Sequence, residues 1–533
     1  MELSNGSPYL LSLGISKSLL AIVWIAGPLS GALVQPYIGI KSDGCRSRYG
    51  KRRPFILGGM IATVVSLAGL AWAKDVVSTI LGMFGAEADS RGVKVTVIVI
   101  AVLMVYVLDF AINVVQAAIR AFIVDNAPGH QQDAANAWAS RMAGLGNIVG
   151  YLFGFVNLPK YLPILGNTQF KVLCALASAS MIMTICVSCS AITERDPSLD
   201  PLPRNQDAGI TAFFKTLYRS IRDLSPQTRR VCQVQFFAWI GWFPFLFYTT
   251  TYVGEIYAEH FYADQPDMTQ EEIDKYWQQG TRAGTFALFI FALVTFTASV
   301  LLPFLVTKSH EPALAANEES DRLSQAATPT TPTIAATAAG SYFGFQPAAT
   351  AEDTIPNSTG PRTSRRHLLG KVPHLPSLGL PWLTLRRTWL LSHLLFALLT
   401  WLTFLVRSVT GATILVALIG IPWAITQWIP FALIAAEIRR RENFHQRYVE
   451  DDGQSEEGSG SEGQAGIVLG IHNVAIAAPQ VIATLVSSVV FRALQKPRGS
   501  VGDESVAWVL RFGGCAALVA AWLTKGMGEE RRA

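Results

Sequence analysis

Charged residues are scarce in this chain. Asp, Glu, Lys and Arg make up 15% of its 533 residues, whereas a soluble protein usually carries about 25%. This shortage excludes an ordinary soluble domain. The formal net charge is only +5, and the basic residues lie mainly in short connections between apolar runs, so we expect no nucleic-acid partner.

Cysteine is also rare, which argues against a disulfide framework. The sequence has 6 cysteines, and most lie in or beside apolar runs, where we expect them to act as small hydrophobic side chains. Cys186 and Cys189 form a single CxxC pair, which is weak evidence for a metal site. The sequence lacks a P-loop or hydrolase motif, so we expect neither an enzyme nor a nucleotide-driven pump, and no metal.

Long apolar runs dominate what is present. A helix of about 20 apolar residues spans the roughly 30 Å hydrocarbon core of a bilayer. About eleven such runs recur along the chain, which predicts an all-α, multi-pass protein embedded in the lipid bilayer. The runs are 19–40, 55–73, 95–116, 138–158, 170–191, 231–252, 283–306, 388–406, 412–435, 467–493 and 505–523.

Lysine and arginine indicate the orientation, because they concentrate in the cytoplasmic connections of membrane proteins. The basic clusters at 41–53, 215–230, 362–387 and 439–441 fall on one side when the runs are threaded alternately. An acidic segment at 255–274 falls on the other side. The C-terminus is therefore predicted to be cytoplasmic. We expect the plasma membrane, with the vacuolar membrane as the alternative.

The start of the chain does not fit this pattern. Residues 1–15 are too short and too polar to cross a bilayer, and they lack the basic stretch of a signal peptide. Either the protein has an odd number of spans, or a first helix is truncated upstream of Met1. We favour the truncated helix, which would make twelve spans in all.

Composition divides the chain into two bundles. We predict an N-terminal helical bundle at 1–192, a cytoplasmic central loop at 193–230, a C-terminal helical bundle at 231–525 and a cytoplasmic tail at 526–533. Two insertions interrupt the second bundle. Residues 307–381 are rich in Ala, Thr, Ser and Pro, and residues 450–464 are rich in Gly, Ser and acidic residues. We expect both insertions to be disordered and cytoplasmic.

Two charged residues, Asp109 and Arg120, lie within the apolar residues 93–124. An ionised group at bilayer depth costs about 2.5 to 3.5 kcal/mol, so such groups usually form pairs or line a water-filled path. Eleven positions make about three helical turns, so Asn113 and Gln116 fall on the same face as the two charges. The stripe indicates the wall of a substrate or proton pathway. A static ion pair that joins two helices is the alternative.

Several short motifs follow one another in a fixed order. They are GPLSG at 27–31, VQP at 34–36, RYGKRRPF at 48–55, LD at 108–109, RAF at 120–122, WFPF at 242–245, GIPW at 420–423 and PFALI at 430–434. Their order resembles that of the sucrose transporters, which are glycoside and sucrose proton symporters of the major facilitator superfamily. The residues of these motifs resemble those of the fungal branch of the family more than those of the plant branch.

This resemblance implies a major facilitator fold and import of sucrose, or of related alpha-glucosides such as maltose, with protons by alternating access. By resemblance, Asp109 is the proton acceptor, and Arg120 binds sugar hydroxyls or pairs with that carboxylate. Movement of the guanidinium from the carboxylate to the sugar would couple binding to protonation. The proton is the coupling ion, and we expect no cofactor besides it.

The neutral polar residues at membrane depth suit a small, neutral, hydroxylated substrate. The candidates for substrate binding, besides Arg120, are Asn113, Gln116, Asn147, Gln35, Gln427, Asn473 and Trp242. The tryptophan is included because sugar rings stack on aromatic faces. Ordinary core packing is the alternative for Trp242, and a hydrogen bond to a neighbouring helix is the alternative for Asn147.

The basic connection after the first run resembles the gating loop of the superfamily, in which an aspartate, arginines and a helix dipole hold the cytoplasmic side in one state. The candidates are Gly39, Asp43, Arg48, Gly50, Arg52 and Arg53. A topological anchor that uses only the positive charges is the alternative. For the whole chain, the alternatives are a membrane sugar sensor that does not transport and an inactive truncated carrier. We expect a monomer.

Overall fold

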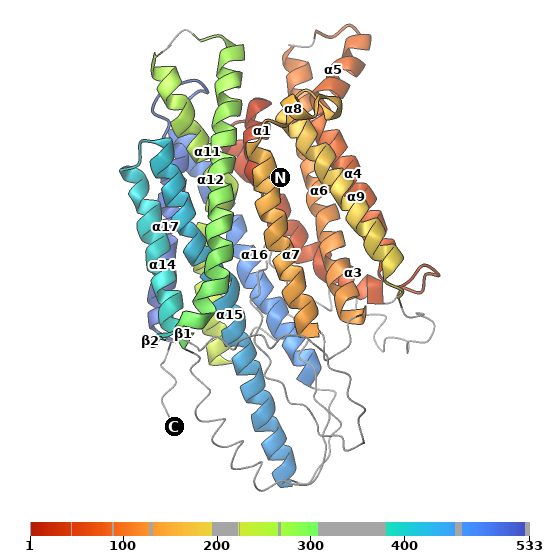
Figure 1. Ribbon diagram of the computed structural model, residues 1–533, viewed down its shortest axis with the longest axis vertical. Helices are drawn as coiled ribbons and strands as arrows, with labels where there is room; N and C mark the ends of the chain where they lie inside the picture. Colours follow the sequence, from red (N-terminus) through yellow and green to blue (C-terminus); the bar gives the residue numbers. More distant parts are fainter. Residues whose placement is uncertain are drawn as a thin grey trace, which may run out of the picture.

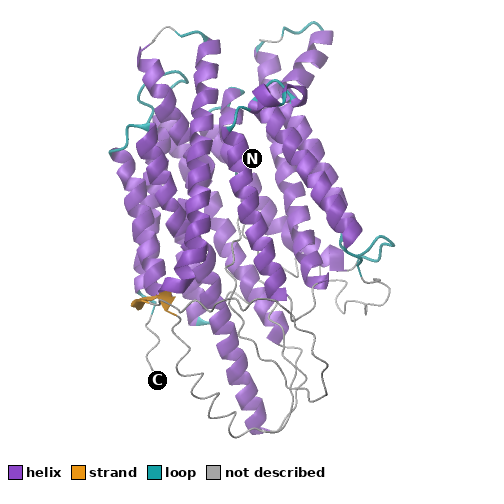
Figure 2. Ribbon diagram, viewed as in Figure 1, coloured by secondary structure: helices purple, strands orange, loops and turns teal. Residues whose placement is uncertain are grey.

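Long helices run side by side along the long axis of the molecule (Figure 1). The computed structural model describes residues 2–43, 45–87, 90–126, 132–194, 222, 224–264, 268–307, 380–452 and 461–527. Within these residues, the secondary structure is helical apart from loops and one small sheet (Figure 2). Ten helical segments of the described chain are long and apolar enough to cross a membrane, which confirms the predicted all-α membrane fold.

The first half of the chain forms one set of helices. They are a π-helix at Glu2–Gly6, α1 (Ser7–Ser12), α2 (Lys17–Val23), α3 (Ala26–Asp43), α4 (Arg53–Ala71), α5 (Ala73–Met83), α6 (Arg91–Asn126), α7 (Gln132–Phe155), α8 (Leu158–Tyr161), a short 3-10 helix at Pro163–Leu165 and α9 (Gln169–Ala191). The predicted span at 138–158 corresponds to α7, which has 24 residues and packs against α12 of the second half.

The second half forms the other set. Its elements are α11 (Pro226–Asp264), α12 (Gln270–Leu305), β1 (Val306–Thr307), β2 (Leu380–Thr384), α14 (Leu385–Trp401), a 3-10 helix at Leu402–Phe404, α15 (Val409–Asp452), α16 (Ser461–Leu494) and α17 (Ser505–Lys525). Glycines allow the closest approach of these helices. A Cβ atom on Gly241 of α11 would lie 2.6 Å from the carbonyl oxygen of Gly513 on α17, so neither position tolerates a side chain without displacement.

The two ends of the bundle are named here by the connections that they carry. At the lower face in Figure 1, α3 ends and α4 begins; at the upper face, α11 ends and α12 begins. The two halves meet where α16 packs against α2 and α3, and where α12 packs against α7. This arrangement leaves α3 and α11 on the boundary between the halves.

The first residues of the chain are buried between the halves. Ser7 donates a hydrogen bond to the Phe247 carbonyl oxygen on α11 at 2.7 Å, and Trp277 Nε1 of α12 donates to the Pro8 carbonyl oxygen at 3.1 Å. These first residues are therefore an integral part of the core.

Regular secondary structure extends into both predicted insertions. The ends of the first insertion are joined by a parallel pair of short strands, β1 and β2, and residues 308–379 lie outside the described residues. For the second, α15 continues to Asp452 and α16 begins at Ser461, so only 453–460 lie outside the described residues. The predicted insertion at 450–464 is therefore partly helical.

Candidate functional site

The predicted polar stripe lies on α6 and faces α3. Asp109 and Asn113 are 1% and 0% exposed, so both lie in the interior. The Asn113 side chain accepts a hydrogen bond from Gln35 Nε2 at 2.7 Å and donates one to Ser30 Oγ at 2.8 Å; both partners belong to α3. It also donates to the Asp109 carbonyl oxygen at 2.9 Å. We call Ser30, Gln35, Asp109 and Asn113 the α3–α6 seam. Its polar contacts join the two helices beside the buried carboxyl group of Asp109.

Asp109 and Arg120 belong to one helix, because α6 is continuous from Arg91 to Asn126. A helix rises about 1.5 Å per residue, so eleven positions separate the two residues by about 16 Å along its axis. An ion pair requires an N···O distance of at most about 4 Å, which side chains three turns apart on one helix do not reach. The alternative in which Arg120 pairs with Asp109 therefore does not fit this geometry.

The remaining neutral candidates lie on several helices. Gln116 of α6, Asn147 of α7 and Asn473 of α16 are half-buried, whereas Gln427 of α15 is 1% exposed. The Oε1 atoms of Gln116 and Gln427 have no hydrogen-bond partner within the described residues. The structure brings Gln35 and Asn113 together, but it records no hydrogen bond from Asn147, Gln427 or Asn473 to the seam in the described part of the chain.

Trp242 belongs to the packed core of the second half. It is 1% exposed, and its ring centroid lies 4.3 Å from that of Phe396 and 4.9 Å from that of Trp423. These neighbours come from α14 and α15, so the indole joins three helices. The structure therefore favours core packing for Trp242 over the predicted platform for a sugar ring.

A small cavity marks the boundary between the halves at the level of α3 and α11. Its volume is about 10 Å³, and its lining includes Gly27, Pro28 and Trp239. A single water needs about 10 to 15 Å³, so the halves nearly touch here. Trp239 Nε1 is buried and has no hydrogen-bond partner among the residues that the structure describes. From the sequence, Trp239 is a candidate platform for a sugar ring in the same way as Trp242, which lies three positions further along α11.

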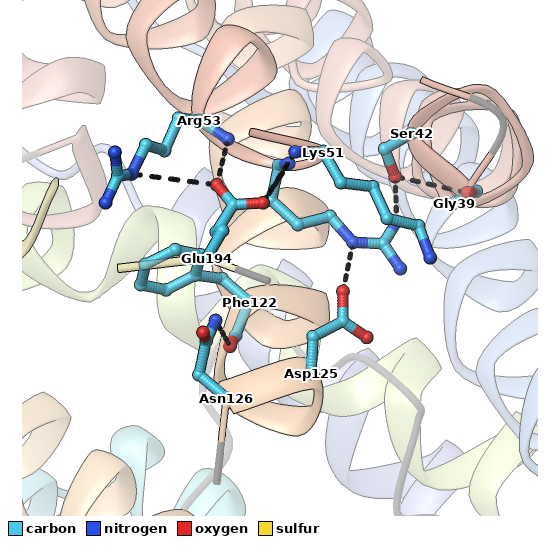
Figure 3. A network of polar contacts seen from close by, with 9 residues as sticks. Gly39, Ser42, Lys51, Arg53, Phe122, Asp125, Asn126 and Glu194 are labelled. Atoms are coloured by element: carbon cyan, nitrogen blue, oxygen red, sulfur yellow. Dashed lines mark hydrogen bonds and ion pairs between the residues drawn. The ribbon is translucent and has the colours of Figure 1, made fainter. Parts of the chain in front are cut away.

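Glu194 organises the connection between α3 and α4 at the lower face (Figure 3). Its carboxylate accepts hydrogen bonds from the backbone N–H groups of Lys51, Arg52 and Arg53 at 2.6, 2.8 and 3.0 Å. These groups precede or open α4, and an anion is favourable at a helix N-terminus. The backbone at Gly50 has φ +112°, and a Cβ there would lie 2.5 Å from Glu194 Oε1, so the turn requires glycine.

Arg52 connects the same loop to α3 and α6. Its Nε donates to Asp125 Oδ2 at 2.7 Å, and its Nη1 donates to Ser42 Oγ. Ser42 in turn donates to the carbonyl oxygen of Gly39 at 3.1 Å. We call Ser42, Arg52, Asp125 and Glu194 the lower-face network; all four lie in the first half of the chain.

The predicted gating residues divide accordingly. Gly39, Gly50, Arg52 and Arg53 take part in the network, and Arg53 Nε lies 3.7 Å from Glu194 Oε1. Arg48 lies outside it, because its Nη2 donates to its exposed neighbour Tyr49. The side chain of Asp43 lies outside the described residues. The acids that receive these contacts, Asp125 and Glu194, were missed because each is more than 70 positions from its partner in sequence.

A second buried charge cluster joins the halves near the upper face. Lys17, 7% exposed, forms ion pairs with Glu255 of α11 and with Asp503, 2.7 Å away, and donates to Ser505 Oγ at 3.0 Å. Burial raises the pKa of the Asp503 carboxyl. The Lys17 ammonium and hydrogen bonds from Lys17 and Ser505 lower this pKa by more than burial raises it, so the pKa lies below its usual range.

This cluster corrects the prediction of an acidic loop at 255–274. The helix α11 continues to Asp264, so Glu255 lies on a helix and is buried against Lys17. Two further contacts join the halves near the same face: Ser18 Oγ lies 3.1 Å from Ser488 Oγ, and Arg282 Nε donates to the Phe155 carbonyl oxygen at 3.0 Å. The upper ends of the two halves are therefore held together by polar contacts.

The helices of membrane length, the boundary between two halves and the polar seam next to it define a multi-pass membrane protein built like a carrier. Comparison with protein families identifies the family of carriers to which the chain belongs. The model of the Major Facilitator Superfamily matches residues 5–317, and the chain belongs to this superfamily.

Relatives of the chain have names that describe transport. It is 36% identical to the general alpha-glucoside permease of Schizosaccharomyces pombe, over 98% of this chain and 89% of the permease. It is 30% identical to the sucrose transport protein SUT3 of Oryza sativa subsp. japonica, over 57% of this chain and 60% of that protein. It is 25% identical to the sucrose transport protein SUT5 of Oryza sativa subsp. indica, over 100% of this chain and 86% of that protein.

Solved structures share the fold. The xylose transporter XylE from E. coli, in a partially occluded inward-open conformation, matches with a TM-score of 0.50 at 12% identity and covers 100% of this chain and 95% of its own. The nucleoside transporter NupG matches with a TM-score of 0.50 at 11% identity and covers 98% of this chain and 94% of its own. At these identities the likeness concerns the fold alone.

Proposed function

We propose that the protein imports sucrose or a related alpha-glucoside, such as maltose, together with protons by alternating access. The names of its relatives support an alpha-glucoside or sucrose as substrate. The observation that carries the proposal is the α3–α6 seam, where neutral amide and hydroxyl groups lie beside the buried Asp109. Such a surface suits a neutral, hydroxylated ligand and provides a carboxylate for the coupling proton.

In this mechanism Asp109 takes up the proton and Arg120 contributes to sugar binding. Because about 16 Å of helix separates them, coupling through a direct exchange of partners does not fit. We propose instead that sugar binds along the stripe, between the two charges, and contacts Asn113 and Gln116. Bound sugar would then exclude water from both ends of the stripe, which penalises an ionised Asp109 and favours its protonation.

Alternating access would open the boundary between the halves, which the structure holds nearly shut at Trp239. A space of about 10 Å³ cannot accommodate a sugar, so the unpartnered Trp239 Nε1 would meet substrate only after the halves separate. We propose a cytoplasmic lower face, where the network around Arg52 and Glu194 holds α4 against α6 and α9 during this movement. Each charge that crosses about 100 mV contributes about 2.3 kcal/mol, enough to drive accumulation.

The remaining assignments belong to the same proposal. The two bundles are residues 1–192 and 231–525, the central loop at 193–230 and the C-terminus are cytoplasmic, and the membrane is the plasma membrane. The chain acts as a monomeric carrier rather than an enzyme and needs no cofactor besides the proton.

The experiment records the pH of the medium while sucrose, then maltose, is added to yeast cells that lack their own sugar carriers and express this chain. We expect sugar-dependent alkalinisation, because each imported sugar removes a proton from the medium. Asp109→Asn should reduce it to the level of an empty vector. Asp75→Asn is the matched control, since it changes a carboxylate of α5 that is exposed and pairs with Lys171 of α9, outside the seam, and it should keep the signal.

A membrane sugar sensor gives a different result. It would bind sugar without any change of external pH and would tolerate Asp109→Asn. If the protein is shown to be at the cell surface and neither sucrose nor maltose gives a pH signal, the proposed transport is overturned.

A further inference from the structure

A cavity opens at the upper face, separate from the α3–α6 seam. Its volume is about 530 Å³, within the range of about 300 to 1,000 Å³ that is usual for small-molecule sites. Both halves contribute to it: the turn between α1 and α2, the first half of α5 and the upper end of α6 on one side, and the upper ends of α11 and α12 and the α16–α17 connection on the other. We call it the upper vestibule. Lys17, Glu255 and Asp503 belong to its lining, so the buried charge cluster borders it directly.

Two neutral polar atoms that line the vestibule lack partners. Tyr262 is 8% exposed, and its hydroxyl group has no hydrogen-bond partner within the described chain. The Oε1 atom of the half-buried Gln495 also has no hydrogen-bond partner within the described chain. A buried polar atom without a partner costs about 1 to 3 kcal/mol, so both positions favour a ligand that supplies hydroxyl groups.

The charges around the vestibule nearly balance, because its lining carries residues of both signs: Lys17, Lys74, Lys94, Lys496 and Arg498 against Glu255, Glu259, Asp274 and Asp503. Arg498 Nη2 lies 2.8 Å from Asp274 Oδ1, and Lys17 Nζ lies 2.7 Å from Asp503 Oδ2. Glu259 Oε1 accepts a hydrogen bond from a backbone N–H group at 2.9 Å. Charges that neutralise one another leave little net attraction for an ion, whereas a hydroxyl and an amide oxygen remain for hydrogen bonding. The lining therefore suits a neutral, hydroxylated ligand better than a charged one.

We propose that the upper vestibule is a second sugar-binding site, which a neutral mono- or disaccharide occupies from outside before it passes between the halves. This inference rests on the proposed function, because it takes the upper face as the external one. Tyr262 and Gln495 bind the sugar hydroxyls, and the Lys17 cluster beside them keeps the bound sugar out of the boundary until the halves separate.

The test compares wild-type protein with Tyr262→Phe/Gln495→Leu in carrier-deficient yeast. Neither change removes a hydrogen bond of the fold, since both atoms lack partners in the described residues. Initial maltose uptake should show a rise of about three- to tenfold in the external concentration that gives half-maximal rate, at unchanged maximal rate. The maximal rate of maltose efflux, measured from cells preloaded with saturating maltose, should be unchanged, because the variant weakens loading of the vestibule and not the movement of the halves. A general structural defect would instead lower the maximal rate in both directions.

Tyr257→Phe is the matched control, since it removes the same hydroxyl group from α11 but outside the vestibule lining, and it should leave external half-saturation unchanged. An external half-saturation that does not change in the double variant, or a maximal rate that falls in both directions, overturns the vestibule.

Failure of transport itself is separated by equilibrium binding of radiolabelled maltose to the purified full chain. If wild-type protein transports nothing, the proposed function fails. Binding that the double variant weakens and Tyr257→Phe does not would still support the vestibule. Equal binding by all three proteins, or no binding, would overturn it.

Discussion

Single side chains decide how the seam between α3 and α6 is held. Asn113 satisfies Gln35 and Ser30 at once, in an interior where an amide without a partner is costly. The stripe itself could be predicted from sequence, because its period along 93–124 matches that of a helix. Its partners on α3 could not, because Gln35 lies 78 positions away from Asn113 and no local pattern specifies which helix faces it.

The first prediction concerns this pair. Gln35→Leu and Asn113→Leu should each lower the stability of the protein, because each leaves the other amide buried without its partner. The double variant should lose less than the sum of the two, with a coupling of about 0.6 to 2 kcal/mol as for other hydrogen bonds between membrane helices. Denaturation midpoints of the purified wild-type, single-variant and double-variant proteins give the coupling. Strictly additive losses would contradict the hydrogen bond.

At the scale of elements, the all-α membrane fold could be predicted, but the ends of several helices could not: the sequence indicates about eleven spans, and ten helices of the described chain have the length and composition of a span. Glu255 and Glu259 suggested a loop after 252 because charges usually mark the end of a span. The helix α11 continues to Asp264, since Lys17, 238 positions earlier, compensates the first of these charges. Trp242 shows the same limit: the sequence cannot distinguish a sugar platform from an indole that packs between α14 and α15.

The turn before α4 gives the second prediction. Gly50→Ala should lower the thermal midpoint of the purified protein, because a left-handed backbone costs a residue with Cβ about 1 to 2 kcal/mol and the Cβ would displace Glu194. Gly58→Ala is the control on α4 itself, where a Cβ meets nothing within 4 Å. That variant should match wild type or exceed it, since alanine favours a helix by about 1 kcal/mol over glycine. Equal effects of the two substitutions would show that Glu194 does not occupy the space beside Gly50.

At the scale of the whole molecule, the polar contacts described between the halves gather near the upper face. Lys17 of α2 forms ion pairs with Glu255 and Asp503. The next residue, Ser18, contacts Ser488 of α16. The lower-face network, in contrast, joins elements of the first half. Alternating access therefore requires the upper contacts to break when the external side opens, while the lower network can persist within its bundle.

The third prediction tests this movement with a disulfide that holds the contact between Ser18 and Ser488 closed. The hydroxyl oxygens of Ser18 and Ser488 are 3.1 Å apart, so the two side chains meet across the boundary, as a disulfide between cysteines at these positions requires. Oxidation of Ser18→Cys/Ser488→Cys should abolish sugar uptake, because the halves can no longer separate at the upper face, and reduction should restore it. Each single cysteine variant should transport equally well before and after oxidation. If the cross-linked protein, verified by mass spectrometry, still imported sugar at the rate of its reduced form, the upper contact would not need to open during transport.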